Sequence, residues 1–279
     1  MTQCPGATPY PIPPAVQEAY GPADLGSMPL FAGGFINFGY WQGIDLDQPL
    51  TEHDRISSEL AMYRHVLAAL APTEGLRALE VGCGRGIGSA VALEEYGFAH
   101  VTGMDIHPQQ LERAQQANSG LLARHPEQLR FAHGAAESMP FGDGEFDRVH
   151  SVEAAQHFRD LDAFARETAR VLRPGGRAAV ASFFVPDADP ARAARLAELL
   201  DSFATGLDVA HTIPLLTDSL ERAGLTGIRV TPIGTSVWTG WDRWLAKTWK
   251  PDTWPRNFLR AYGEGILDYF TVTAERPEK

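Results

Sequence analysis

Ala78-Leu79-Glu80-Val81-Gly82-Cys83-Gly84-Arg85-Gly86 is the stretch of this chain that decides the fold. Its apolar beginning belongs to a short buried strand that we predict over residues 77–82, and a helix is predicted over residues 86–96. Glycine permits the tight turn between them and lets backbone N–H groups come close to a ligand. Ligands of open α/β sheets bind at the carboxyl ends of the strands, so this turn predicts a binding site. A turn selected only for packing is the alternative.

The spacing of the glycines distinguishes two kinds of nucleotide site. The dinucleotide fingerprint G-x-G-x-x-G would have its third glycine at position 87, but that position is Ile87 and the glycine is Gly86. The spacing therefore disfavours an NAD-dependent oxidoreductase, which stays as a rival interpretation.

Strands and helices alternate on both sides of this turn. A helix with Thr51 as its N-cap is predicted before the first strand. Further buried strands are predicted over residues 100–106, 129–133, 146–152 and 177–185, with helical stripes between them. Beyond them we predict helices over 187–203 and 215–223, a strand over 227–233, a helical insertion over 236–265 and a last strand over 269–274. This order predicts a mainly parallel sheet with helices on both faces.

The composition excludes several classes of protein. Hydrophobic residues make up 44% and charged residues 21% of the 279 residues, as in globular proteins. The net charge of −11 disfavours a nucleic-acid substrate, because phosphate backbones bind to concentrated basic surfaces. There is no apolar run long enough to predict a membrane span. The two cysteines, Cys4 and Cys83, lie far apart, which argues against a disulfide framework and favours a cytoplasmic location.

Four further motifs follow the Gly-rich turn in order: Asp105-Ile106, the run Gly134 to Phe141, Phe146-Asp147-Arg148-Val149, and Leu172-Arg173-Pro174-Gly175-Gly176. Together with Glu-x-Gly-x-Gly-x-Gly at residues 80–86, they resemble the motifs of the class I S-adenosylmethionine-dependent methyltransferases. Ala135 departs from that pattern, because the family usually has an Asp there to bind the adenine amino group.

The resemblance implies a Rossmann-like α/β fold with a seven-stranded sheet, an antiparallel last strand and a helical cap. It implies S-adenosyl-L-methionine as the cofactor and S-adenosyl-L-homocysteine as its product. Asp105 would accept the ribose hydroxyls and Ile106 would pack on adenine. The implied cofactor-binding residues are Glu80, Gly82, Cys83, Gly84, Asp105, Ile106, Ala136, Glu137 and Ser151. We expect an N-terminal arm and cap over residues 1–50, a cofactor-binding core over 51–185, and cap helices with the last two strands over 186–279.

The segment Ser151 to Phe158 follows the fourth strand, where the family places the reacting methyl group. It lacks the Asn/Asp-Pro-Pro-Tyr/Phe motif of nucleic-acid amino methyltransferases. With residues 37–41, it resembles the macrolide sugar O-methyltransferases, and tocopherol- and sterol-type C-methyltransferases share parts of the pattern. His157 is a candidate general base. Glu153 would orient His157, take the proton itself or stabilise a cation. The alternatives are that His157 packs under the cofactor and that Glu153 caps the next helix.

Aromatic residues are concentrated late in the chain. Trp238 and Trp241 share one helix face, and with Tyr40 and Trp41 they are predicted to line a pocket for a bulky apolar substrate. Packing of that face on the sheet is the alternative. The carboxylate set of metal-dependent catechol-type relatives is missing, so no metal is expected. The arm is expected to order over the cofactor, and a homo-oligomer formed through the arm is a further expectation.

These observations favour methylation of a small, apolar secondary metabolite, with O-methylation ahead of the alternatives. C-methylation of a terpenoid or alkene, with cyclisation of a carbocation, is the first alternative. A non-methylating cyclase on the same fold is another.

Overall fold

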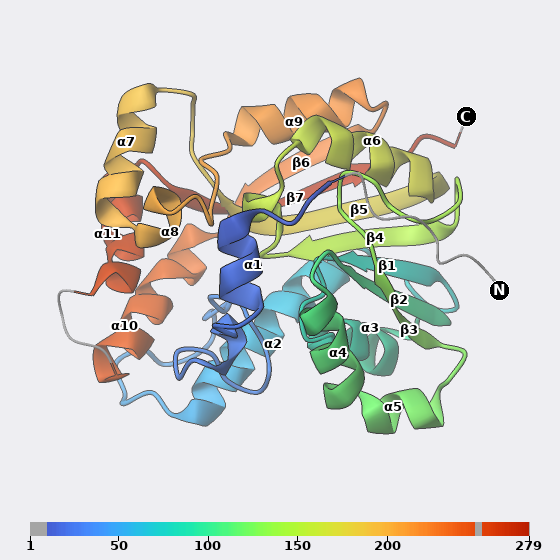
Figure 1. The fold of residues 1–279 in the computed structure, drawn as a ribbon, viewed down its shortest axis with the longest axis horizontal. Helices are drawn as coiled ribbons and strands as arrows, with labels where there is room; N and C mark the ends of the chain where they lie inside the picture. The colour runs from blue at the N-terminus through green and yellow to red at the C-terminus, as the bar shows by residue number, and fades with distance from the viewer. Residues whose placement is uncertain (1–9, 249–252, 279) are drawn as a thin grey trace.

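The computed structural model describes residues 10–248 and 253–278 (Figure 1). Its centre is a seven-stranded sheet in the order β3-β2-β1-β4-β5-β7-β6. The first five strands are parallel, and β7 runs antiparallel to both of its neighbours, as predicted. The strands are β1 (Arg77–Val81), β2 (His100–Asp105), β3 (Leu129–His133), β4 (Phe146–Val152), β5 (Leu172–Phe184), β6 (Thr226–Pro232) and β7 (Asp268–Glu275).

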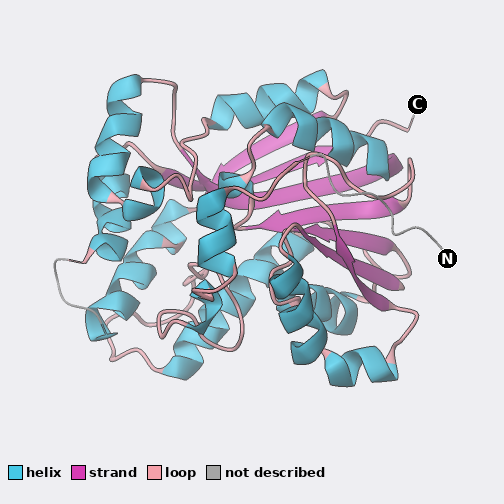
Figure 2. Cartoon of the chain, in the orientation of Figure 1, coloured by secondary structure: helices cyan, strands magenta, loops and turns pink. Residues whose placement is uncertain are grey.

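Helices cover both faces of the sheet (Figure 2), because alternate residues of the central strands are apolar on opposite sides. On β1, Ala78 belongs to one hydrophobic cluster and Leu79 to another. The first cluster includes α2 (Glu52–Ala68) and α3 (Ile87–Tyr96), and the second includes α6 (Leu161–Val171) and α9 (Ile213–Arg222). The remaining helices of the core are α4 (Pro108–Ala117) and α5 (Ser119–Arg124). This layering leaves the carboxyl ends of β1, β2 and β4 as the edge where a ligand can enter.

Local sequence explains several element boundaries. Thr51 caps α2 as predicted: its hydroxyl accepts from the Asp54 N–H at 3.2 Å, and the Asp54 carboxylate accepts from the Thr51 N–H at 2.8 Å. β5 begins at Leu172 rather than at the predicted residue 177. In the pairing of β4 with β5, Phe146 lies opposite Leu172 and Arg148 lies opposite Arg177. Residues 173–176 therefore form an irregularity within β5, whereas the sequence analysis placed them before the strand.

Two predicted helices are shorter than expected. The helix predicted over 187–203 is divided into α7 (Pro190–Leu199) and α8 (Asp201–Ala204), because Leu200 has an extended backbone. The insertion predicted over 236–265 contains α10 (Trp238–Thr248) and α11 (Asn257–Gly263). Its residues 249–252 lie outside the described part of the chain.

The arm is more regular than its Pro-rich sequence suggested. Residues Pro14–Tyr20 form helix α1, since proline is tolerated in the first turn, where its missing N–H is not needed. Residues 1–9 of the predicted arm are not described. The division into 1–50, 51–185 and 186–279, and association of two chains through the arm, stay predictions. Among the described residues, none of the helices has the length and hydropathy needed to cross a bilayer.

Candidate active site

A cavity of about 600 Å³ lies at the carboxyl ends of β1, β2 and β4. The arm helix α1 crosses this edge (Figure 1), and arm residues including Ile12, Val16 and Tyr20 line the cavity. The expectation that the arm orders over this site therefore agrees with the structure. Seven of the predicted cofactor-binding residues line the same cavity: Gly82, Cys83, Gly84, Asp105, Ile106, Ala136 and Glu137.

The Gly-rich loop has a backbone that other residues rarely adopt. Gly82, Gly84 and Gly86 have φ angles of 76°, 52° and 70°. The N–H groups of Gly82 and Cys83 donate to the Met104 carbonyl at 2.8 and 3.0 Å, which ties the loop to β2. A Cβ atom at Gly82 would lie 2.3 Å from the Cβ of Ala154, so the loop can approach the end of β4 only because this residue is glycine.

Asp105 is fixed at the end of β2. One carboxylate oxygen accepts from the Gly84 N–H at 2.9 Å and the other from the His107 N–H at 2.8 Å. Burial raises the pKa of Asp105, while these two N–H donors act in the opposite direction. The carboxylate is thus already oriented, and it retains acceptor capacity for hydroxyl groups of a ligand.

Glu80 and Ser151, two of the predicted cofactor-binding residues, do not line the cavity. Glu80 is fully buried and accepts from the Ser89 hydroxyl of α3, and burial raises its pKa to about 7. The Ser151 hydroxyl donates to the Val81 carbonyl at 2.8 Å. Both side chains are therefore engaged within the protein, Glu80 between β1 and α3 and Ser151 between β4 and β1.

His157 lies in the cavity wall with both ring nitrogens engaged. Nδ1 is 3.0 Å from the Leu207 carbonyl and 3.2 Å from the Asp208 carboxylate. Both partners are acceptors, so Nδ1 carries the proton and Nε2 keeps a lone pair. The Tyr20 hydroxyl of the arm lies 2.7 Å from Nε2 and is the donor to it.

Tyr20 and Asp208 were missed by the sequence interpretation. Tyr20 is separated from His157 by 137 residues, and Asp208 lies in an irregular segment after α8. No periodicity or spacing connects either residue with His157. Gln110 of α4 was missed as well; it lines the cavity and donates to the Tyr20 carbonyl at 3.2 Å.

Glu153 also lines the cavity, but it does not orient His157, because Asp208 does. Its Oε1 accepts from the Phe38 N–H at 2.6 Å and from the Tyr269 hydroxyl at 2.9 Å. Burial is the largest influence on this carboxyl and raises its pKa to about 8. These contacts go to the arm and to β7, so the alternative role as a cap of the next helix is not observed.

The four aromatics predicted to bind substrate lie outside the cavity lining. Trp238 and Trp241 are almost fully buried, and Trp238 stacks on Phe258 with ring centroids 5.3 Å apart. The Trp41 indole N–H donates to the Phe38 carbonyl at 2.9 Å, and Tyr40 stacks on His65. The aromatic face packs within the protein: Trp238 contacts Phe183 of β5 and Tyr269 of β7, which agrees with the alternative interpretation that this face packs on the sheet.

Comparison with known proteins identifies the family. Residues 79–180 match the family described as methyltransferase domain. The fatty-acid O-methyltransferase of Mycolicibacterium smegmatis is 32% identical over 191 residues, which cover 67% of this chain and 68% of that protein. The chain belongs to the class I S-adenosylmethionine-dependent methyltransferases.

Two further likenesses describe this methyltransferase. The erythromycin 3''-O-methyltransferase of Saccharopolyspora erythraea is 30% identical over 228 residues, covering 77% of this chain and 70% of that protein. The solved structure of a geranyl diphosphate C-methyltransferase from Streptomyces coelicolor, in complex with Mg²⁺, geranyl diphosphate and S-adenosyl-L-homocysteine, superposes with a TM-score of 0.73. It covers 86% of this chain and 90% of that one at 18% identity, so this likeness shows the fold alone.

The residues around the cavity of the methyltransferase fit S-adenosyl-L-methionine. Gly82 and Gly84 of the Gly-rich loop line the cavity without a side chain, which leaves room for a ligand close to the backbone, and Asp105 presents fixed acceptors beside them. Ala135 is fully buried and does not line the cavity, so adenine recognition would depend on the segment around Ala136 and Glu137. The Glu137 carboxylate accepts from the Arg159 N–H at 2.8 Å, which fixes that segment.

Proposed function

We propose that this methyltransferase transfers the methyl group of S-adenosyl-L-methionine to a hydroxyl group of a bulky, uncharged, largely apolar natural product. The observation that carries the proposal is the state of His157. Its Nδ1 is held by two acceptors, and its Nε2 lies in the cavity wall with a lone pair that accepts from a hydroxyl group. That hydroxyl belongs to Tyr20, and a substrate hydroxyl in the same place would be within reach of the same nitrogen.

The charges of the cavity support an uncharged substrate. Much of the wall is apolar, including Ile12, Val16 and Ile36. The two arginines that line it are engaged: Arg85 pairs with Asp24 at 2.8 Å, and Arg159 donates to the Gly206 carbonyl at 3.0 Å. These features favour a neutral compound over a prenyl diphosphate.

The proposed reaction uses the cofactor and the side chains of His157, Asp208 and Tyr20. When bound, S-adenosyl-L-methionine supplies a methyl group on a positively charged sulfur. His157 accepts the hydroxyl proton at Nε2, and Asp208 stabilises the imidazolium that forms, as a carboxylate beside a catalytic histidine does. Tyr20 holds the ring in place until the substrate hydroxyl replaces it. Closure of the arm excludes water from the cavity.

The test is transfer of an isotope-labelled methyl group to a panel of uncharged hydroxylated polyketides and long-chain alcohols. Each would be paired with its deoxy analogue and with geranyl diphosphate as an anionic control. We expect methyl ethers from the hydroxylated compounds, identified by mass spectrometry and nuclear magnetic resonance. A new C–CH₃ group, or transfer to the diphosphate alone, would contradict the proposal.

C-methylation is the second candidate, because Glu153 places a carboxyl in the cavity where a cation could form. The cyclase alternative has no observation in its favour. The family assignment removes the NAD-dependent oxidoreductase.

Asp208→Asn is expected to lower kcat by about ten-fold with little change in KM, because the amide cannot stabilise the imidazolium. Steady-state kinetics with the methyl acceptor found above would measure this. Asp201→Asn is the matched control, since Asp201 is an exposed residue of α8, just before the segment that contains Asp208. An equal loss in both variants, or a change confined to KM, would show that Asp208 does not act through His157.

A further inference from the structure

Glu153 has an unusual backbone for its residue type. It follows β4 with a φ of 50°, in the left-handed region that favours glycine. Such a conformation is unfavourable for a residue with a Cβ atom and persists only where the surroundings enforce it. Here the Phe38 N–H and the Tyr269 hydroxyl both donate to Oε1, which holds the carboxyl in the cavity wall. The position of the Glu153 carboxyl is therefore set by contacts with the arm and with β7.

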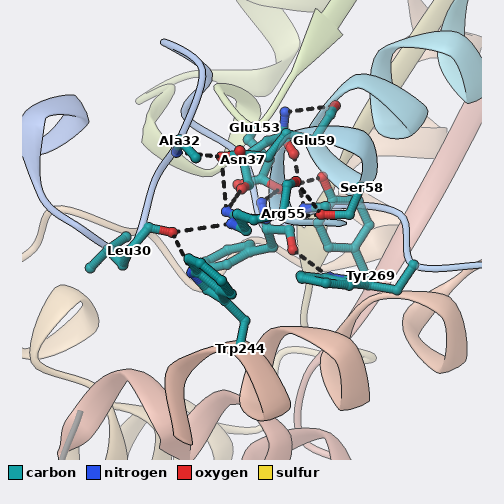
Figure 3. A network of polar contacts seen from close by, with 12 residues as sticks. Leu30, Ala32, Asn37, Arg55, Ser58, Glu59, Glu153, Trp244 and Tyr269 are labelled. Carbon is teal, nitrogen blue, oxygen red and sulfur yellow. Dashed lines mark hydrogen bonds and ion pairs between the residues drawn. The ribbon is translucent and has the colours of Figure 1, made fainter. Parts of the chain in front are cut away.

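The network behind Glu153 extends to a fully buried arginine (Figure 3). Arg55 of α2 donates to the Asn37 carbonyl and pairs with Glu59 at 3.0 Å. Its guanidinium also lies over Trp241, 5.1 Å from the ring centroid. Because Arg55 fixes the Asn37 carbonyl, the N–H on the other side of the same planar peptide group, that of Phe38, is directed at Glu153. The aromatic core thus holds the arm so that it supplies one of the two donors to Glu153.

Opposing influences act on the charge of Glu153. Burial and the Asp208 carboxylate raise its pKa, whereas the Phe38 N–H, the Tyr269 hydroxyl and Arg55 lower it, and the result is about 8. The titratable and charged groups that face or interact with it are Tyr20 of the arm, Arg55, Glu59 and Tyr63 of α2, Cys83 and Asp105 at the ends of β1 and β2, His157, Asp208, and Tyr269 of β7. Because the pKa of Glu153 is close to neutral pH, one more positive charge in the cavity would ionise this carboxyl.

We propose that Glu153 is the residue by which the cavity distinguishes the positively charged cofactor from its neutral product. The proposal rests on the proposed function only in that S-adenosyl-L-methionine binds in this cavity. The cofactor has a sulfonium and the product a thioether, while the nucleoside and amino-acid parts of the two are the same. A carboxylate fixed in the wall attracts the first ligand more than the second. Selective loss of the product after transfer follows from this difference.

The sign of the pH dependence follows from linkage. A nearby cation favours the ionised carboxyl, so binding of the cofactor lowers the pKa of Glu153 from about 8 and releases a proton. Affinity for the cofactor then rises as the pH increases towards about 8 and becomes constant above it. The product lacks the charge, so its affinity does not show this rise. Titration of the ligands themselves is the same for the wild type and Glu153→Gln, so the difference between these two proteins isolates the contribution of the Glu153 carboxyl.

Calorimetry with S-adenosyl-L-methionine and S-adenosyl-L-homocysteine tests the proposal without any methyl acceptor. We expect the ratio of cofactor to product affinity to increase by about ten-fold between about pH 6.5 and about pH 8.5. Binding of the cofactor at about pH 7 should release a proton, seen as a heat that depends on the ionisation enthalpy of the buffer. In Glu153→Gln, which keeps the acceptor at Oε1, the ratio should not change with pH and no proton should be released.

Two further variants separate charge from structure. Tyr269→Phe removes one donor from Oε1, so the rise in the ratio should move to higher pH. Glu137→Gln changes another carboxylate of the same cavity, and the pH dependence of the ratio should remain. A wild-type ratio that does not change with pH, or a rise that persists in Glu153→Gln, would overturn the proposal. Because only binding is measured, methylation at carbon instead of oxygen would leave these outcomes unchanged.

Discussion

Replacement of His157 by alanine is expected to lower kcat by about 10² to 10⁴-fold, the range found for a general base that takes a proton in the transition state. In the structure Nε2 lies in the cavity wall, and Asp208 fixes the opposite nitrogen. Steady-state kinetics with the methyl acceptor would measure this loss.

His157→Gln is the informative companion variant, because it retains a hydrogen-bonding side chain of similar size but cannot act as a base. It should be impaired almost as strongly as the alanine variant. Full activity in both variants would mean that alignment alone drives the transfer and that the base is wrongly placed. Normal activity in His157→Ala together with a severe loss in Glu153→Gln would favour C-methylation.

Asp105→Ala is expected to weaken binding of S-adenosyl-L-methionine by ten-fold or more. Loss of a hydrogen bond to a charged group costs roughly 1.5–3 kcal/mol, and ten-fold corresponds to about 1.4 kcal/mol. The structure adds a second reason: Asp105 also holds the Gly84 N–H, so its removal loosens the Gly-rich loop. Calorimetry would give the affinity, and circular dichroism would show that the fold survives.

Asp105→Asn provides a graded control, since the amide keeps one acceptor oxygen and should lose less affinity than alanine. The cofactor and its product should be weakened alike, because the ribose is common to both. Unchanged affinity in Asp105→Ala would remove Asp105 from the cofactor site.

The sheet and the Gly-rich loop could be predicted because their signals are local. Glycine at positions 82, 84 and 86 and an apolar run before them require a strand, a turn and a helix in sequence. Asp105 could be predicted as well, because the carboxyl ends of parallel strands meet at one edge of a sheet. What these signals share is that each depends on residues close in the chain or on the regularity of the sheet.

The remaining site residues depend on contacts between distant segments. Glu80 has the right residue type at the right strand, but its side chain bonds to Ser89 of α3 and lies away from the cavity. The periodicity of Trp238 and Trp241 predicts a buried face and does not say whether a ligand or the protein covers it. Tyr20 reaches His157 across 137 residues, a pairing that no spacing rule contains.

The arm segment that contains helix α1 forms a part of the cavity wall that is separate in sequence from the cofactor-binding strands. The Gly-rich loop and Asp105 belong to the sheet edge, whereas Ile12, Val16 and Tyr20 of the opposite wall come from a short segment near the start of the chain. Mutations in that segment can reshape the wall without disturbing the packing of β1 and β2. A laboratory library limited to residues 10–13 would vary this wall while it leaves the buried Val16 and Tyr20, the partner of His157, in place.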